Sequence, residues 1–169
     1  MPFNLLKKYN QLLELASFNP YERKKSLMGV FNQDIVENKN FKFEGKQINP
    51  TPVDGQIVID TLFTHLTTVI VDKKTNKREF EMSRSQRLHW VKYHIDKKKT
   101  DNMLIFSVKE PNGNRTYIYD KDEKYVIVLE PLRKVNEYYL LTAYHLQGKD
   151  AKRNKFLKKY KKYRLNEVL

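Results

Sequence analysis

Apolar side chains recur at helical spacing along the first third of the chain. Residues 3–16 place them three and four positions apart, which predicts a helix with one buried face. A second helix is predicted to begin at Pro20, a residue favoured in a first turn, and to extend to about Glu37. Gly45 predicts the turn of a small hairpin, and the Pro and Gly residues over 50–55 predict a boundary there.

Beyond that boundary the pattern changes to short alternating segments, which are typical of strands. Residues 56–66 fit either a strand or a short helix, whereas residues 84–96 carry apolar groups at helical spacing after a serine cap. The Asn-Gly pair at 112–113 is a strong hairpin signal, and the basic segment 149–163 predicts a closing helix. The predicted strands are residues 67–72, 78–82, 102–110, 115–120, 124–130 and 137–146.

These elements predict an α+β fold, in which a helix packs on an antiparallel β-meander, with N-terminal helices and a basic C-terminal helix added. The boundary near residue 54 divides the chain into an N-terminal helical extension, residues 1–53, and a main domain, residues 54–169. A helix over one face of the sheet leaves the other face to form an open cleft. We therefore expect functional side chains on that other face.

The charge balance indicates a polyanionic partner. The 169 residues include 33 Lys and Arg against 20 Asp and Glu, a formal net charge of +13. This excess favours nucleic acid, an anionic membrane surface or an acidic protein, and the alternative is a basic surface that only maintains solubility. No run approaches the ~18 apolar residues of a membrane span, and the N-terminus alternates too finely for a signal peptide. We expect a soluble protein that acts in the cytoplasm.

Residue type and spacing exclude several kinds of site. The chain has no Cys, which removes disulfides and thiolate metal sites. Its His and carboxylate residues show no recognised metal-ligand spacing, and it has neither a P-loop nor a G-x-G-x-x-G segment. The G-x-S-x-G elbow of serine hydrolases is missing too. We therefore expect neither a metal ion nor a cofactor.

The last predicted strand carries hydroxyl groups among its apolar residues. Because side chains alternate between the two faces of a strand, Tyr138, Leu140, Thr142 and Tyr144 are predicted to share the more open face. Thr142 and Tyr144 then stand about 7 Å apart, a spacing at which two hydroxyls bracket a phosphate. The alternative is that Thr and Tyr are simply good strand residues.

The helix predicted over 84–96 adds cations beside this strand. Arg87 lies at the edge of the apolar stripe, where its guanidinium reaches into a cleft, and Arg84 lies one turn earlier. The planar guanidinium suits phosphate because it donates two parallel hydrogen bonds, although a surface Arg commonly pairs with a nearby carboxylate. The basic tail, with Phe156, Tyr160 and Tyr163 among its lysines, fits either a nucleic-acid grip or a docked helix with a solvated face.

Histidine is a candidate proton shuttle for metal-free RNA cleavage, because it titrates near neutral pH. Such cleavage needs a base for the 2′-hydroxyl, an acid for the leaving 5′-oxygen and cations for the phosphate. A structural histidine remains the alternative for each of the candidates. They are His65, His89, His94 and His145.

Two stretches in this order carry a family resemblance: "FTHLTTVIVDKKTNKREFEMSRSQRLHWVKYHI" and "RTYIYDKDEKYVIVLEPLRKVNEYYLLTAYHL". A His-Leu element, an Arg-rich helix with a central aromatic residue and a run of short strands ending in Thr-Ala-Tyr resemble the phage-associated members of the barnase–EndoU–colicin–RelE (BECR) nuclease superfamily. The resemblance covers about residues 57–163 and leaves the first fifty residues unexplained. It implies a metal-independent endoribonuclease that forms a 2′,3′-cyclic phosphate.

The resemblance also implies roles for individual residues. His65 would act as acid or base, Arg87 would hold the phosphate, and Thr142 and Tyr144 would orient the phosphate or the attacking hydroxyl. Weaker candidates for contacts to the RNA backbone are Arg84, Lys92 and Arg115.

Three function hypotheses stand beside one another. The first is a toxin-like endoribonuclease whose partner is RNA. The second is a non-catalytic nucleic-acid-binding module, for which binding falls steeply with salt and no cleavage occurs. The third is an effector or interaction domain that recognises an acidic partner, such as an immunity or antitoxin protein.

Overall fold

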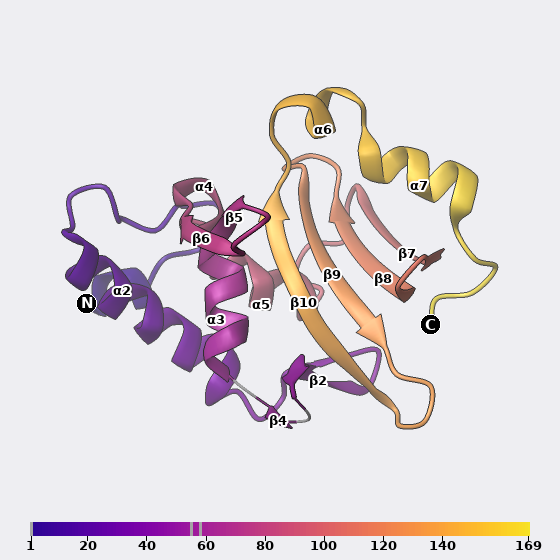
Figure 1. Ribbon diagram of the computed structural model, residues 1–169, viewed down its shortest axis with the longest axis horizontal. Coiled ribbons are helices and arrows are strands. Elements are labelled where there is room, and N and C mark those ends of the chain that lie inside the picture. The colour runs from indigo at the N-terminus through magenta and orange to yellow at the C-terminus, as the bar shows by residue number, and fades with distance from the viewer. Residues whose placement is uncertain (1, 55, 58) are drawn as a thin grey trace.

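A six-stranded sheet forms the centre of the protein (Figure 1). The computed structural model describes residues 2–54, 56–57 and 59–169. The strand order across the sheet is β1-β2-β10-β9-β8-β7, and the pairing is mostly antiparallel. Helices pack against this sheet, so the fold is of the α+β class with a β-meander, as the sequence predicts.

Four consecutive strands make up the predicted meander. Pro111 and Asn112 turn the first hairpin and are followed by Gly113 at a φ of +118°, and Lys124 ends the second turn at a φ of +50°. Each strand pairs with the next along the chain. The strands are β7 (Met103–Glu110), β8 (Gly113–Asp120), β9 (Tyr125–Pro131) and β10 (Glu137–His145).

The N-terminal third contributes strands to the same sheet. β1 (Lys42–Phe43) and β2 (Lys46–Pro50) form the hairpin predicted at Gly45, whose φ of +76° favours a residue without a Cβ. β2 then pairs in parallel with β10. Residues 2–53 therefore pack as part of one sheet and one core with the main domain, and they are not purely helical. Near the boundary, β3 (Pro52–Val53) and β4 (Gln56–Ile57) form a separate two-stranded pair.

The helix predicted over residues 3–16 is wrong beyond its first turn. α1 (Pro2–Leu5) ends there because the buried side chain of Asn4 bonds both the N–H and the carbonyl of Glu14, at 2.9 Å each, and folds the segment back. Leu13 and Leu15 are still buried, but they enter the core from a loop. The two residues are only two positions apart, and Leu12 is exposed, so burial in this segment does not follow the predicted helical spacing.

The second predicted helix is present as two successive elements. α2 (Pro20–Phe31) begins with a capping box, in which Asn19 and Glu22 bond each other's backbone N–H groups. It continues into a π-helix, η1 (Asn32–Val36). π-Helices are rare in proteins, and those that do occur are often found at functional sites.

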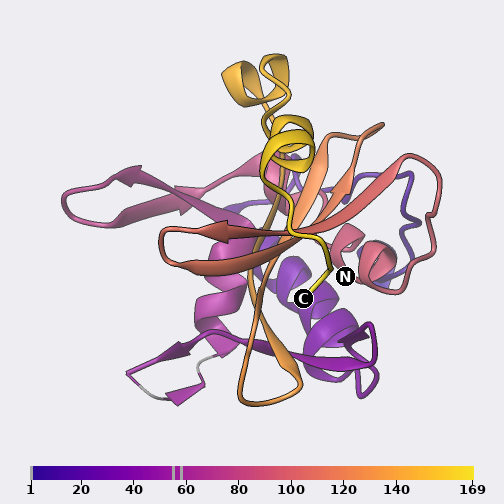
Figure 2. The same cartoon turned by 90° about the vertical axis from the view of Figure 1, so that its right-hand side faces the viewer.

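One face of the sheet is covered by helices and the N-terminal segment (Figure 1). The ambiguous segment 56–66 is helical from Ile59 onward. A hairpin of two strands follows it and projects from the body (Figure 2). These elements are α3 (Ile59–Thr67), β5 (Thr68–Asp72), β6 (Lys77–Phe80), α4 (Met82–Ser85) and α5 (Trp90–Ile95).

The prediction of one continuous helix over residues 84–96 is wrong, because the helix is interrupted between α4 and α5. The N-terminal segment docks at this break: the Leu13 N–H donates to the carbonyl of Gln86 at 3.0 Å. His89 Nε2 lies 2.9 Å from the carbonyl oxygen of Lys8 and 2.8 Å from that of Gln11. The Gln86 carbonyl thus accepts from the N-terminal segment, and tighter turns, such as that from the Leu88 N–H to the Ser85 carbonyl at 3.2 Å, connect α4 to α5.

The opposite face of the sheet is less open than the sequence suggests. The predicted basic helix breaks at Asn154, which has a φ of +51°, into α6 (Gly148–Lys152) and α7 (Lys155–Tyr163). α7 docks Phe156 onto this face, where its ring meets those of Tyr117 and Tyr119. A cleft remains beside α7. Within the described residues, no helix is long and apolar enough to cross a lipid bilayer.

Candidate functional site

A β-bulge in β10 sets the direction of the predicted site residues. Leu140 pairs with Leu129 and Thr142 with Val128, so Leu141 is an extra residue between them. Leu140 faces the helix-covered core, whereas Thr142 and Tyr144 face the α7 side. The prediction that Thr142 and Tyr144 share a face holds, but the prediction that Tyr138 and Leu140 share it is wrong, because the bulge reverses the alternation.

Arg84 lies at the centre of the candidate site. Its Nη1 donates to the carbonyl oxygens of His65 at 2.7 Å and Thr68 at 3.1 Å, and to the hydroxyl of Thr142 at 3.4 Å. Its guanidinium carbon also lies 5.2 Å from the ring centroid of Tyr144. Nε is buried without a hydrogen-bond partner among the described residues. Arg84 thus joins α3, α4 and β10 at one point.

His65 lines an open cavity on one side of Thr142, with a volume of about 340 Å³. Burial, together with the nearby Arg78 guanidinium, lowers the pKa of His65, so its imidazole is neutral at neutral pH. Arg78 is fixed by hydrogen bonds from Nε to the hydroxyl of Thr68 at 2.8 Å and from Nη2 to its carbonyl at 3.0 Å. The cavity therefore combines a neutral imidazole with two guanidinium groups, those of Arg78 and Arg84.

A second cavity of about 330 Å³ lies on the other side of Thr142, between the sheet and α7. Burial raises the pKa of the Tyr144 hydroxyl to about 12, so this hydroxyl remains a donor at neutral pH. The Glu110 carboxylate accepts a hydrogen bond from the Tyr117 hydroxyl, and an ion pair with Lys159 balances its negative charge. The remaining charged side chains that line the cavity are cationic: Arg115 and Lys155. Thr142 separates the two cavities and lines both.

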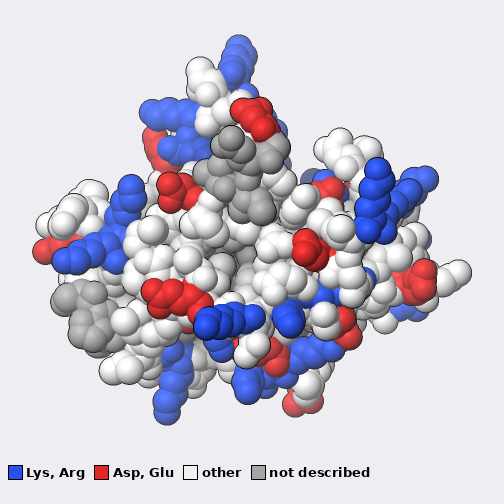
Figure 3. Space-filling model, turned by 90° about the horizontal axis from the view of Figure 1, so that it is seen from below, with Lys and Arg blue, Asp and Glu red and all other residues white. Residues whose placement is uncertain are grey.

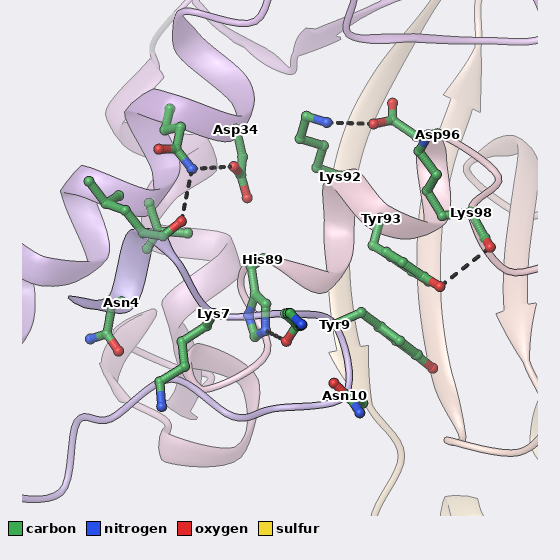
Figure 4. Close-up of a pocket in the computed structure, with 14 residues that line it drawn as sticks. Asn4, Lys7, Tyr9, Asn10, Asp34, His89, Lys92, Tyr93, Asp96 and Lys98 are labelled. Carbon is green, nitrogen blue, oxygen red and sulfur yellow. Dashed lines mark hydrogen bonds and ion pairs between the residues drawn. The ribbon is translucent and has the colours of Figure 1, made fainter. Parts of the chain in front are cut away.

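Arg87 and Lys92 do not join this group. Arg87 Nη1 donates to the carbonyl of Ser83 at 2.7 Å and to its hydroxyl at 2.9 Å, and the guanidinium stacks over Trp90 at 5.1 Å. Lys92 forms an ion pair with Asp96 at 2.6 Å, in a cleft on the helix-covered side (Figure 4). The structure therefore brings together His65, Arg84, Thr142 and Tyr144, with Arg115 beside them.

The other histidines have structural contacts. His89 holds the N-terminal loop, as described above. His94 is buried between the Trp90 carbonyl, 2.8 Å from Nδ1, and the Asp120 carboxylate, 2.9 Å from Nε2. His145 Nδ1 lies 3.3 Å from the Ser83 hydroxyl, on the Arg87 side.

Arg78 is the residue of this site that the sequence interpretation missed. It lies on the hairpin opposite Ile70, which also lines the His65 cavity. Pairing the two predicted strands across their polar turn would have placed Arg78 opposite Ile70, but not this hairpin against α3. The interruption between α4 and α5 directs Arg87 away from the candidate site, and no Pro or Gly in residues 86–89 predicts it.

On the face of the molecule that Figure 3 draws, the basic side chains form no single patch. In the view of Figure 3, Lys and Arg side chains are interspersed with Asp and Glu. Among the described residues, no group of three or more His, Asp or Glu side chains is placed to hold a metal ion.

Comparisons with protein-family models, with curated proteins and with solved structures gave no match.

Proposed function

We propose that the chain is a metal-independent endoribonuclease of the BECR type, whose reacting phosphodiester lies over Thr142. The observation that supports this most directly is the convergence of His65, Arg84 and Thr142 at one cavity, with a protonated Tyr144 on the other side of Thr142. A neutral imidazole, a hydroxyl donor and guanidinium groups are the chemistry that 2′-hydroxyl attack requires.

In the proposed reaction, His65 takes the proton of the RNA 2′-hydroxyl, and the resulting alkoxide attacks the adjacent phosphorus. Arg78 and Arg84 stabilise the negative charge that develops on the phosphate oxygens. The Thr142 hydroxyl orients the phosphate, and the Tyr144 hydroxyl gives its proton to the leaving 5′-oxygen. Afterwards water takes the proton from His65 and returns one to Tyr144. The P–O5′ bond breaks, and the products are a 2′,3′-cyclic phosphate and a 5′-hydroxyl end.

The test is cleavage of a defined single-stranded RNA by the purified chain in the presence of a chelator. Replacing the general base in His65→Gln should lower kcat by about 10²–10⁴-fold. Arg78→Ala and Thr142→Ala should also lower kcat. Arg133→Ala removes the same charge from the exposed β9–β10 loop at the far end of β10, and its activity should stay close to that of the wild type. Thermal unfolding of each variant checks that the fold is retained.

Intact RNA after incubation with the folded wild-type chain would contradict the proposal. So would equal activity in His65→Gln and Arg133→Ala. Product ends with a 5′-phosphate would exclude the 2′-hydroxyl mechanism.

A non-catalytic nucleic-acid-binding module is the second candidate function. It is favoured by the cationic cavity at α7, where Arg115 and Lys155 line the surface without a neighbouring histidine. In that case RNA binds with a steep salt dependence, Lys155→Ala reduces the salt slope by about one, and His65→Gln changes nothing. A stable complex with an acidic protein, without affinity for RNA, would instead support an interaction domain.

A further inference from the structure

A separate cleft of about 700 Å³ lies between the N-terminal segment, η1 and α5 (Figure 4). It shares no lining residue with the two cavities beside Thr142. Its volume lies within the ~300–1,000 Å³ of typical small-molecule sites. An acidic side chain, Asp34, lies on its floor, whereas basic side chains lie at its rim, and this arrangement limits what the cleft can bind.

Asp34 forms part of the floor. The residue is only 7% exposed, and its Oδ1 accepts one long hydrogen bond, from Gln33 Nε2 at 3.3 Å. Figure 4 shows its other carboxylate oxygen directed into the cleft toward His89. The nearby Lys92 is paired with Asp96 instead. Burial raises the pKa of Asp34, as expected for a carboxyl group with too few donors around it. The π-helix η1 holds this residue in place.

His89 provides a second acceptor that lacks a donor. Both neighbours of its Nε2 are carbonyl oxygens, so Nε2 carries the proton. Burial lowers the pKa of this imidazole, so the ring is neutral and Nδ1 is an acceptor. Nδ1 is buried and has no hydrogen-bond partner among the described residues. The Asp34 carboxylate is therefore the acceptor that the floor offers to a ligand, and the buried Nδ1 of His89 supplies no donor beside it.

The rim and one wall have the opposite character. Lys8 and Lys98 are exposed there, so an anionic group would meet positive charge at the mouth. The rings of Tyr9 and Tyr93 stack at 4.1 Å and 3°, which makes a stiff aromatic wall. Tyr93 is further fixed by a hydrogen bond from its hydroxyl to the Lys98 carbonyl at 3.3 Å.

We propose that this cleft binds a nucleoside 5′-phosphate whose base carries an exocyclic amine. The amine donates to Asp34 on the floor, the base lies against the tyrosine wall, and the phosphate meets Lys8 and Lys98 at the rim. An acceptor at depth, an aromatic side and cations at the mouth match the order of amine, ring and phosphate in such a molecule. This site does not depend on the proposed nuclease activity.

The experiment compares AMP, IMP and adenosine by their effects on the backbone amide NMR signals of the full chain. IMP replaces the amine of AMP by a carbonyl, and adenosine lacks the phosphate. AMP should shift the signals of Gln33, Asp34 and His89. Loss of the charge-assisted hydrogen bond should weaken IMP about 10- to 100-fold relative to AMP. Adenosine should bind more weakly than AMP at low salt and equally at high salt.

Variants test which residues contact the base of the ligand and which contact its phosphate. Asp34→Asn presents an amide that donates to the carbonyl of IMP, so the preference for AMP over IMP should disappear or reverse. Asp101→Asn removes the same charge from an exposed turn and should leave the preference unchanged. The double variant Lys8→Gln, Lys98→Gln should bring the affinity for AMP down to that for adenosine.

Equal binding of AMP and IMP to the wild type would overturn the proposal, as would no signal shift at 10 mM AMP, a concentration well above the ~1 µM–1 mM range of most metabolite sites. Shifts centred on His65 and Thr142 would place the nucleotide at the other site and would overturn it as well. His65→Gln should leave AMP binding intact, which separates this result from any failure of the nuclease proposal.

Discussion

Replacing Asp120 by Asn tests the network that joins the N-terminal segment to α5 and the sheet. Asp120 is fully buried at the end of β8. Its Oδ2 accepts two hydrogen bonds at 2.9 Å, from the Tyr9 hydroxyl and from His94 Nε2. Its Oδ1 accepts from Lys99 Nζ at 2.5 Å and from two backbone N–H groups of the following turn. Every donor in this network depends on a carboxylate at its centre.

The expected cost follows from these bonds. Asparagine keeps the shape but offers one oxygen and one NH2 group, so the donors on one side lose their acceptor. A hydrogen bond to a charged group contributes about 1.5–3 kcal/mol, and removing one partner of a buried ion pair costs about 3–5 kcal/mol. Losing the two bonds at Oδ2 therefore predicts a loss of about 3–5 kcal/mol. That is a large part of the ~5–15 kcal/mol that stabilises a typical domain.

Urea unfolding followed by circular dichroism measures this loss. Asp122→Asn is the matched control, because the Asp122 side chain is 51% exposed although it also contacts Lys99. It should cost less than about 1 kcal/mol. If Asp120→Asn costs no more than Asp122→Asn, the network does not hold the N-terminal segment in place and the reasoning is wrong.

Acid should weaken the same network: burial alone would raise the pKa of Asp120, but the hydrogen bonds from its side-chain partners hold it well below its usual value. Its contribution is therefore complete above the unfolded pKa of about 3.9 and is lost as pH falls further, and urea midpoints of the wild type should fall more steeply than those of Asp120→Asn below about pH 4. NMR titration of the His65 ring should give a midpoint below about 6.5, and Arg78→Ala should raise that midpoint by removing a neighbouring cation. Phe156→Ala should destabilise the chain by about 3–5 kcal/mol in urea, whereas Tyr163→Ala, 63% exposed, should have little effect.

The sequence predicts the meander well because its strands are defined by local patterns. Alternation and tight-turn residues lie within each hairpin, and the fold class follows from them. Elements near the N-terminus are harder to predict, since contacts with distant residues decide them. The short α1 ends because Asn4 bonds Glu14, and the helix predicted over 84–96 breaks where the N-terminal loop contacts Gln86 and His89.

The candidate site shows the same division between local and distant information. Thr142 and Tyr144 are recognised correctly as sharing a face, because both follow the bulge at Leu141 and the alternation between them is regular. The choice of Arg87 over Arg84 depends on a regular helix, and the structure has only one turn of helix there. Arg78 comes from a strand that sequence alone does not place against α3.

The parallel pairing of β2 with β10 has a consequence for synthesis on the ribosome. Asn49 on β2 donates to Glu137 on β10 at 2.9 Å, and the two residues are 88 positions apart in the chain. At a synthesis rate of about 5–20 residues per second, β2 leaves the ribosome roughly 4–18 s before the strand with which it pairs. Thr142 emerges later still, so neither cavity beside it exists on the nascent chain until β10 has been made.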